Sequence, residues 1–370
     1  MFGIGRKALI AGLSLMAASV ALALAQKAPE AQKAPESQKT PEFKVGVNIV
    51  NVLATVRDRD GRIVNNLTKD DFILEEDGKP QQITNFFRET DLPLTIGLLV
   101  DTSISQRALI RTEQSAAREF FDDVLRPDRD LAFLIQFDSD VQLLQDLTAS
   151  KEDLQNALYD MQTPGGHRYA RRRFPFLDLS SSRLWQGNAQ FPWPGGGGGQ
   201  IPPIDMPSNP AGTLLYDAVY LASDEVLKNE AGRKTIILIS DGVDQGSKIR
   251  QKEAIETALR ADCIVYSIRY YDADFYRRAG RGIILGGPGS EGYSALKDMS
   301  TQTGGSVYEV SKKLSLAEIF DKIQEELRSQ YSLSYNAPSG PRDGFRKIKL
   351  RTKDSRLKVV TRSGYFSKAS

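Results

Sequence analysis

The chain contains one cysteine and one histidine among its 370 residues. Cys263 cannot form a disulfide within the chain, and a single cysteine excludes a zinc or iron–sulfur centre built from several cysteines. His167 alone likewise excludes a cluster of histidines around a metal. If this protein binds a metal, oxygen atoms must therefore supply the ligands.

The sequence also lacks a large excess of charge of either sign, because 49 basic residues stand against 47 acidic ones and the formal net charge is +2. Such a balance gives no global field that would attract nucleic acid, so we expect no nucleic-acid partner. With 40% hydrophobic residues, the chain is long and apolar enough to bury more than one core.

The N-terminus has the features of an export signal. Arg6 and Lys7 precede an apolar stretch from Ala8 to Leu24, and small residues at its end offer a cleavage site, which predicts a signal peptide over residues 1–25. The stretch is at the short end for a membrane span, and an uncleaved anchor is the alternative. Residues 26–42 repeat a Gln-Lys-Ala/Thr-Pro-Glu unit, which is typical of a linker. We therefore expect a periplasmic or secreted protein with no membrane span after cleavage.

Two segments with the alternating pattern of strands flank the middle of the chain. The first covers residues 43–90 and includes a hairpin signal at Asp77-Gly78 followed by a further strand over 82–87; the second covers residues 331–368. Its last thirty residues carry a net charge of +8, with lysine and arginine alternating with apolar residues as on a solvated strand face. Neither segment has enough strands for its own core, so we predict that both pair into one β-sandwich.

Residues 91–330 alternate strand-like and helix-like segments. The run from Leu92 to Val100 is continuously apolar, as in a strand buried on both faces. Further strands are predicted over 131–137, 141–147, 235–240, 263–268 and 306–309, and helices over 106–125, 150–161, 214–228, 248–260, 294–303 and 315–330. This order predicts an α/β domain with a doubly wound, mainly parallel sheet, whose ligands bind at the carboxyl ends of the strands.

Three segments place oxygen-bearing side chains at that edge. Asp101, Ser103 and Ser105 follow one strand, Thr213 precedes a helix, and Asp241 follows another strand. Two carboxylates and three hydroxyls are the ligands of a hard cation such as Mg²⁺, and they leave room for a carboxylate from a partner. A helix cap is the alternative explanation of the first segment.

Together, Asp101-x-Ser103-x-Ser105, Thr213 in Gly-Thr-Leu-Leu-Tyr-Asp and Asp241 in Ile-Ser-Asp-Gly resemble the metal-ion-dependent adhesion site of von Willebrand factor A domains. The resemblance covers about Leu92 to Gln330, and with its flanks the chain resembles the related proteins of acidobacteria. It implies a Rossmann-like domain that binds Mg²⁺, with Mn²⁺ or Ca²⁺ as alternatives. The serines and the threonine would contact the metal, and the aspartates would hold it directly or through water.

The chain departs from that family in the long segment before Thr213. Residues 164–210 hold eight of the 17 prolines, both tryptophans and a glycine run, which excludes a regular element. Arg171, Arg172, Trp185 and Trp193 are of the residue types enriched where protein partners dock. We interpret the insert as a specificity loop beside the metal, with a disordered insertion as the alternative.

These features predict a binding protein rather than an enzyme. Its partner would be a protein or other ligand that presents an Asp or Glu carboxylate to the metal, in adhesion or in the assembly of a complex. One alternative is a metal-dependent hydrolase in which Mg²⁺ with Asp101 and Asp241 activates water, although the motif places no general base. The other is a scaffold with a vestigial metal site. Neither the partner's identity nor the oligomeric state follows from the sequence.

Overall fold

The structure, a computed structural model, describes residues 49–89, 92–161, 212–272, 290–338 and 344–367. The predicted signal peptide, the repeat and the insert 164–210, with Arg171, Arg172, Trp185 and Trp193, lie outside these residues. Within the described ranges, every helix is too short or too polar to cross a membrane. The described residues all belong to one compact unit.

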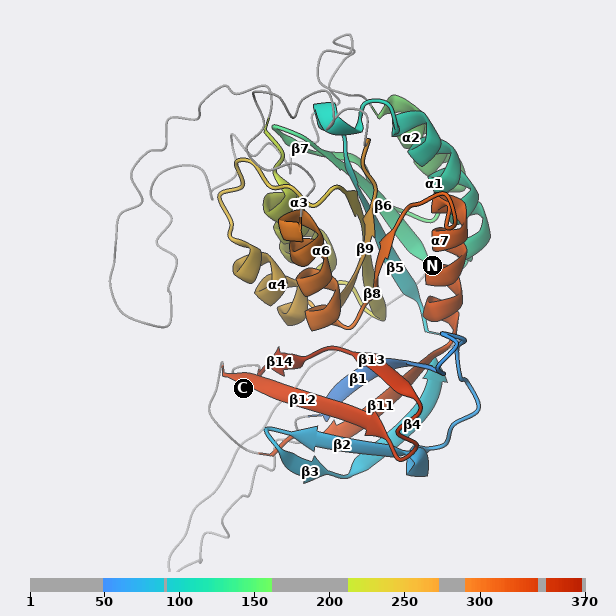
Figure 1. The fold of residues 1–370 in the computed structure, drawn as a ribbon, viewed down its shortest axis with the longest axis vertical. Helices are drawn as coiled ribbons and strands as arrows, with labels where there is room; N and C mark the ends of the chain where they lie inside the picture. The colour runs from blue at the N-terminus through green and yellow to red at the C-terminus, as the bar shows by residue number, and fades with distance from the viewer. Residues whose placement is uncertain (1–48, 90–91, 162–211, 273–289, 339–343, 368–370) are drawn as a thin grey trace, which may run out of the picture. The chain divides into compact units, whose positions relative to one another are not determined.

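The middle of the chain forms a six-stranded sheet with the strand order β10-β9-β8-β5-β6-β7 (Figure 1). All neighbours are parallel except β6 and β7, which are antiparallel. The strands are β5 (Leu94–Asp101), β6 (Leu131–Phe137), β7 (Val141–Thr148), β8 (Arg233–Ser240), β9 (Cys263–Arg269) and β10 (Val307–Glu309). Every residue of β5, β8 and β9 is buried, as the continuous apolar runs predict.

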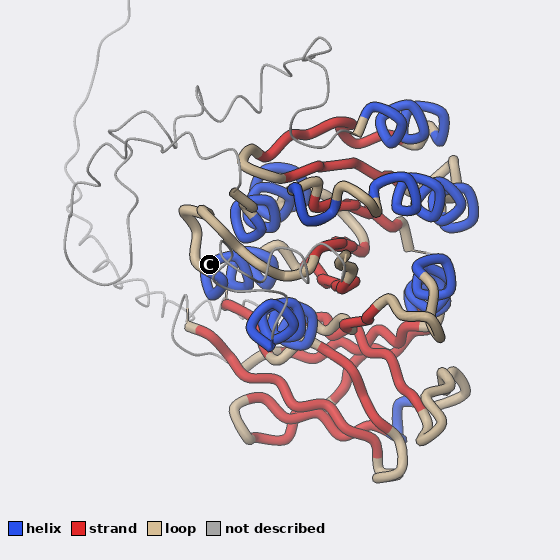
Figure 2. The backbone as a smooth tube through the Cα atoms, turned by 45° about the horizontal axis from the view of Figure 1, so that its top comes forward, coloured by secondary structure: helices blue, strands red, loops and turns tan. Residues whose placement is uncertain are grey.

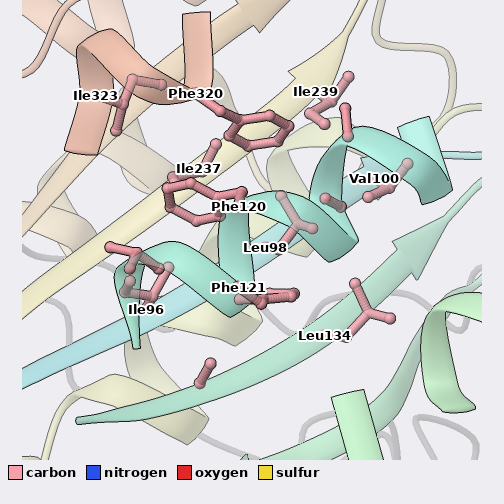
Figure 3. Packing of buried hydrophobic residues seen from close by; sticks show 14 of the residues in the cluster. Ile96, Leu98, Val100, Phe120, Phe121, Leu134, Ile237, Ile239, Phe320 and Ile323 are labelled. Carbon is pink, nitrogen blue, oxygen red and sulfur yellow. The ribbon is translucent and has the colours of Figure 1, made fainter. Parts of the chain in front are cut away.

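Helices cover both faces of this sheet (Figure 2). One face is covered by α1 (Ile110–Val124), α2 (Lys151–Asp160) and α7 (Leu316–Arg328), and the other by α3 (Leu215–Leu221), α4 (Gln251–Arg260) and α6 (Ser290–Thr303). On the first face Phe120 of α1 stacks on Phe320 of α7, with ring centroids 4.6 Å apart, above Leu98 of β5 (Figure 3). The predicted doubly wound α/β fold is confirmed.

Two predicted helices differ in detail. The helix predicted from residue 106 begins at Ile110, because Ser103 to Gln106 form a tight turn and a short 3₁₀ helix (Ile104–Gln106) after β5. The helix predicted over 214–228 contains α3 and then a π-helical turn, Ala222–Leu227. Both irregularities lie in segments that the apolar period alone reads as regular helix.

The flanking segments build two four-stranded sheets around a shared core. Both sheets combine strands from the two ends of the chain, in the orders β13-β1-β11-β4, where the two ends alternate, and β14-β12-β2-β3, where β12 pairs with β2 in the middle. Their members are β1 (Ile49–Arg57), β2 (Phe72–Glu76), β3 (Lys79–Gln81), β4 (Ile83–Glu89), β11 (Gln330–Asn336), β12 (Phe345–Thr352), β13 (Lys358–Thr361) and β14 (Gly364–Phe366). Val52, Leu74 and Leu333 are buried together in this core. The predicted sandwich with an inserted α/β domain is therefore confirmed.

The hairpin signal at Asp77-Gly78 is a tight turn with φ of +50° and +77°. Its second strand is the short β3, which the sequence analysis missed, and the strand predicted from Gln82 begins at Ile83 and belongs to the other sheet. The alternation in β12 is confirmed, since its residues are exposed and buried by turns. Arg346 is nevertheless on the buried side, where it pairs with the buried Glu76 at 2.7 Å.

Candidate metal centre

Asp101 and Asp241 lie at the carboxyl ends of two neighbouring strands. Asp101 is the last residue of β5 and Asp241 follows the last residue of β8, and these strands are paired in parallel with Val100 opposite Ile239. The two aspartates are 0% and 2% exposed. The fold thus buries two carboxyl groups at one edge of the sheet.

Serine hydroxyls connect this pair. The Ser103 and Ser105 hydroxyl oxygens are 3.0 Å apart, and the Ser105 hydroxyl donates to Asp241 Oδ2 at 2.9 Å. Asp101 accepts from the Ser103 backbone N–H at 3.0 Å, and its other oxygen accepts from the Ser240 hydroxyl at 2.7 Å. The structure therefore brings four of the five predicted metal-binding residues into one hydrogen-bonded network.

Thr213 reaches the same edge through its backbone. It exchanges two backbone hydrogen bonds with Gln245, of 3.0 and 2.8 Å, in the loop that follows Asp241. Its side chain is buried, yet within the part of the chain that the structure describes its hydroxyl is hydrogen-bonded to none of the other four residues. The metal role of Thr213 stays a prediction.

Two further aspartates fix the loop of Thr213 against the loop of Asp241. Asp244 accepts from the Leu215 backbone N–H at 3.0 Å, at the start of α3, and Asp217 accepts from the Ile249 backbone N–H at 2.9 Å. Burial raises the pKa of both carboxyl groups. Neither aspartate is among the residues predicted from the sequence, although Asp217 is part of the Gly-Thr-Leu-Leu-Tyr-Asp motif.

Gly242 allows the chain to turn directly after Asp241. Its φ is +85°, and a Cβ atom at this position would lie 2.2 Å from the backbone oxygen of Gly292 in α6. A side chain would therefore meet both backbone strain and a backbone atom that cannot move aside. The position of Asp241 depends on glycine at this point.

Burial and like charge act together on the aspartate pair. Burial, followed by repulsion from Asp241, raises the pKa of Asp101 from 3.8 to about 7, while its hydrogen bonds from Ser103 and Ser240 oppose the rise. Gln106 donates to Asp241 Oδ2 at 3.2 Å, and its own side-chain oxygen is buried without a partner. These groups concentrate acceptor oxygens and negative charge in an apolar setting.

Glu113 of α1 adds a third acidic group that the sequence analysis missed. It is 1% exposed, and neither of its carboxyl oxygens has a hydrogen-bond partner among the described residues. Burial and the charge of Asp101 raise the pKa of Glu113 well above its usual value. A set of buried acids beside two serine hydroxyls fits a hard divalent cation. Among the described residues no three acidic, histidine or cysteine side chains cluster as metal ligands, so such a site would depend on the hydroxyls.

The chain matches no family model and no curated protein, but it resembles solved structures. A von Willebrand factor type A protein from Catenulispora acidiphila is 10% identical, over 88% of this chain and 75% of that one, with a TM-score of 0.41. An aerotolerance-related membrane protein from Bacteroides fragilis is 13% identical over 63% and 98%, with a TM-score of 0.40. What the chain's own strand order supports is the doubly wound α/β architecture with a mainly parallel six-stranded sheet.

A third solved protein is proximal thread matrix protein 1 from the mussel byssus, whose adhesion-site motif is occupied by zinc. It is 16% identical over 69% of this chain and 50% of that chain, with a TM-score of 0.41. Likenesses this distant carry no conclusion about function. What the α/β domain of this protein does must be argued from its own residues.

Proposed function

We propose that this protein binds a partner outside the cytoplasm through a divalent cation held by its von Willebrand factor A domain. The observation that carries the proposal is the buried pair of Asp101 and Asp241, joined through the Ser103 and Ser105 hydroxyls at the carboxyl edge of the sheet. Two buried carboxyl groups that repel each other are stabilised by a cation between them.

The five residues predicted from the sequence would hold this cation. Ser103, Ser105 and Thr213 offer neutral oxygens, and Asp101 and Asp241 offer charged ones, directly or through water. Mg²⁺ takes about six oxygens and keeps water in part of its shell, so a carboxylate from a partner can complete the shell. Mn²⁺ or Ca²⁺ would serve in its place, since both accept oxygen ligands.

The chemistry of the site favours binding over catalysis. A hydrolase that activates a metal-bound water requires a general base within hydrogen-bonding reach of that water. The network around Asp101 and Asp241 contains serine hydroxyls and the Gln106 amide, and the chain's one histidine is in the insert. We therefore propose adhesion or the assembly of a complex as the use of this site.

The insert 164–210 supplies partner choice in this proposal, and the N-terminal signal directs the protein to the periplasm or the exterior. The insert leads directly into the Thr213 loop, and Arg171, Arg172, Trp185 and Trp193 would contact the partner beside the metal. A variant that lacks 164–210 is expected to lose the partner and to keep Mg²⁺ binding. Retention of the partner by this variant would contradict the role of the insert.

Calorimetric titration of Mg²⁺ tests the metal site itself. The wild-type protein and an Asp146→Asn control, altered at an exposed position of β7, are expected to bind one equivalent, and Asp101→Ala is expected to bind none. If the wild-type protein binds no divalent cation, the site is vestigial and the proposal fails. Phosphoesterase activity that is present in the wild type and absent in Asp101→Ala would instead establish the hydrolase alternative.

Capture from an envelope extract then tests the interaction. The immobilised wild-type protein is expected to retain a partner in Mg²⁺ and to release it in EDTA, and Asp241→Ala is expected to retain none. Capture that persists in EDTA, or that Asp241→Ala performs equally well, would show that the partner does not bind through the metal.

A further inference from the structure

A second site lies at the other end of the sheet. A cavity of about 650 Å³ opens where β8 and β9 begin, between the α/β domain and the sandwich. Asp241 follows the carboxyl end of β8, so the eight residues of that strand separate the cavity from the metal centre by roughly 25 Å. A volume of this size is in the range of cavities that hold small molecules.

The walls of the cavity are rich in positive charge. Among the wall residues that the structure describes, the acidic ones are Glu230 and Asp262, and the basic ones are Lys228, Arg233, Lys234, Arg260, Arg346 and Arg362. Four of the cations have carboxylate partners, in the pairs Lys228–Asp224, Arg260–Glu256, Arg346–Glu76 and Arg362–Asp262. Arg233, the first residue of β8, donates to the backbone oxygen of Leu327.

Lys234 differs from these five cations. It is the second residue of β8 and only 8% exposed, yet it forms neither an ion pair nor a hydrogen bond through its side chain with any residue that the structure describes. The Lys234 ammonium is not fully enclosed by the protein. Because the residue lines the cavity, the ammonium is accessible from it. A lysine side chain with so little exposure and no carboxylate of the described residues paired with it offers an anion in the cavity an unshared positive charge.

Part of the remaining wall is apolar. Leu53 of β1, Leu259 of α4 and Phe366 of β14 line the cavity, and the guanidinium of Arg260 lies 4.2 Å from the centroid of the Phe366 ring. Such a surface accommodates hydrocarbon beside a charged group. Inorganic ions alone would leave it unfilled.

We propose that the cavity binds a small organic anion whose carboxylate or phosphate group pairs with the Lys234 ammonium and whose apolar part packs against Leu53, Leu259 and Phe366. This site is separate from the metal centre, and it does not depend on the function proposed for that centre. Because its walls come from both the α/β domain and the sandwich, a ligand there would also stabilise their association.

Thermal denaturation of the full chain, saturated with Mg²⁺, tests the site. Sodium hexanoate and hexyl phosphate are the two probes, and sodium chloride at equal ionic strength is the reference. At ten times its dissociation constant, one of them is expected to raise the melting temperature by about 3 °C. The probe that saturates at the lower concentration identifies the anionic group as carboxylate or phosphate. The absence of a saturable rise with both probes would overturn the proposal.

Lys234→Met is the decisive variant, and Lys228→Met is its matched control, because Lys228 lies at the cavity but is exposed and already paired with Asp224. Lys228→Met is expected to respond as the wild type does, and Lys234→Met is expected to lose the response. An equal response from Lys234→Met would overturn the proposal. Should that variant not fold, calorimetric titration of both probes into the wild-type protein still decides, since one binding site is expected and none would refute it.

Discussion

The apolar interior around Asp101 and the carboxyl group of Asp241 beside it both disfavour ionisation of the Asp101 carboxyl group. Both effects raise its pKa to about 7 in the folded protein without metal. At a pH between its unfolded and folded pKa values, such an acid is protonated in the folded protein and ionised in the unfolded chain. The free energy of unfolding therefore falls as the pH rises through this range. A proton and a metal cation therefore compete for the Asp101 carboxyl group.

The first prediction concerns this pH dependence. In EDTA, the free energy of unfolding of the wild type, relative to that of Asp101→Asn, is expected to fall between pH 4 and pH 7 by at most roughly 4 kcal/mol. Mg²⁺ is expected to remove the decline, because the cation stabilises the ionised carboxylate. Urea denaturation at pH 4.5, 6 and 7.5 measures both series. If the difference in unfolding free energy between the two proteins in EDTA stays constant or rises with pH, the folded protein does not disfavour ionisation of Asp101.

The second prediction concerns Glu113, the buried acid without a hydrogen-bond partner in the described part of the chain. Glu113→Gln is expected to stabilise the metal-free protein and to weaken Mg²⁺ binding about tenfold, because the amide avoids the cost of a buried acid and cannot ionise to attract the cation. Calorimetry measures the affinity, and urea denaturation in EDTA measures the stability. Glu119→Gln, on the exposed side of the same helix, is expected to change neither. An unchanged Mg²⁺ affinity in Glu113→Gln would contradict the prediction.

Some of these residues were predictable and some were not. Asp101, Ser103 and Ser105 were predicted because alternate residues after a strand point the same way, and Asp241 because it follows the neighbouring strand. Glu113 was missed since an acid within an amphipathic helix is ordinarily solvated.

Among the elements, the turn from β8 into the following loop holds Asp241 in place. The third prediction is that Gly242→Ala lowers the free energy of unfolding by about 3 kcal/mol or more, because a Cβ atom there meets the Gly292 backbone as well as an unfavourable φ. Its matched control is Gly78→Ala, where φ is +77° but no atom lies within 4 Å, and a loss of about 1 kcal/mol is expected. Equal losses in urea denaturation would show that the contact with α6 does not constrain the turn.

The strands were predicted more securely than the polar interior of the sandwich. A strand buried on both faces has a continuous apolar run, and a half-buried one alternates, so β5, β8 and β12 followed from their patterns. Arg346 shares the parity of Ile348 and Leu350, but its charge argues against burial. Only the structure shows its reason, which is the buried Glu76 on β2, 270 positions earlier in the chain.

In the whole molecule, the two ends of the chain meet to form one domain around another. This arrangement was predictable because neither flank has enough strands for a core. The contacts that join the domains were not, since they pair residues far apart in the sequence. Arg57 of β1 forms an ion pair with Glu326 of α7, which is fully buried and also accepts from the Tyr308 hydroxyl. In addition, α7 ends at Arg328 and β11 begins at Gln330, so a movement of α7 would act directly on the sandwich.

The fourth prediction concerns this connection. Arg57→Met is expected to lower the free energy of unfolding by roughly 3–5 kcal/mol, because it leaves the buried Glu326 carboxylate without its cation. Arg62→Met removes an exposed arginine that pairs with Asp58 and Asp60, and a loss of at most about 1 kcal/mol is expected. Differential scanning calorimetry and urea denaturation measure the two variants. A loss in Arg57→Met no larger than that in Arg62→Met would show that the ion pair does not stabilise the association of the domains.

The pairing of β1, β11 and β4 determines how the protein would respond to mechanical load. The chain passes from the sandwich into the α/β domain after β4 and returns to the sandwich at β11. These two strands are paired, with Glu89 opposite Gln330, so tension on a bound partner would load both strands at the same end. The chain enters β1 at Ile49, which lies opposite Asn336 at the far end of β11. Pulling between the partner and the N-terminal segment would therefore slide β1 along β11 in shear, and all six of their paired positions would resist together instead of unzipping in turn.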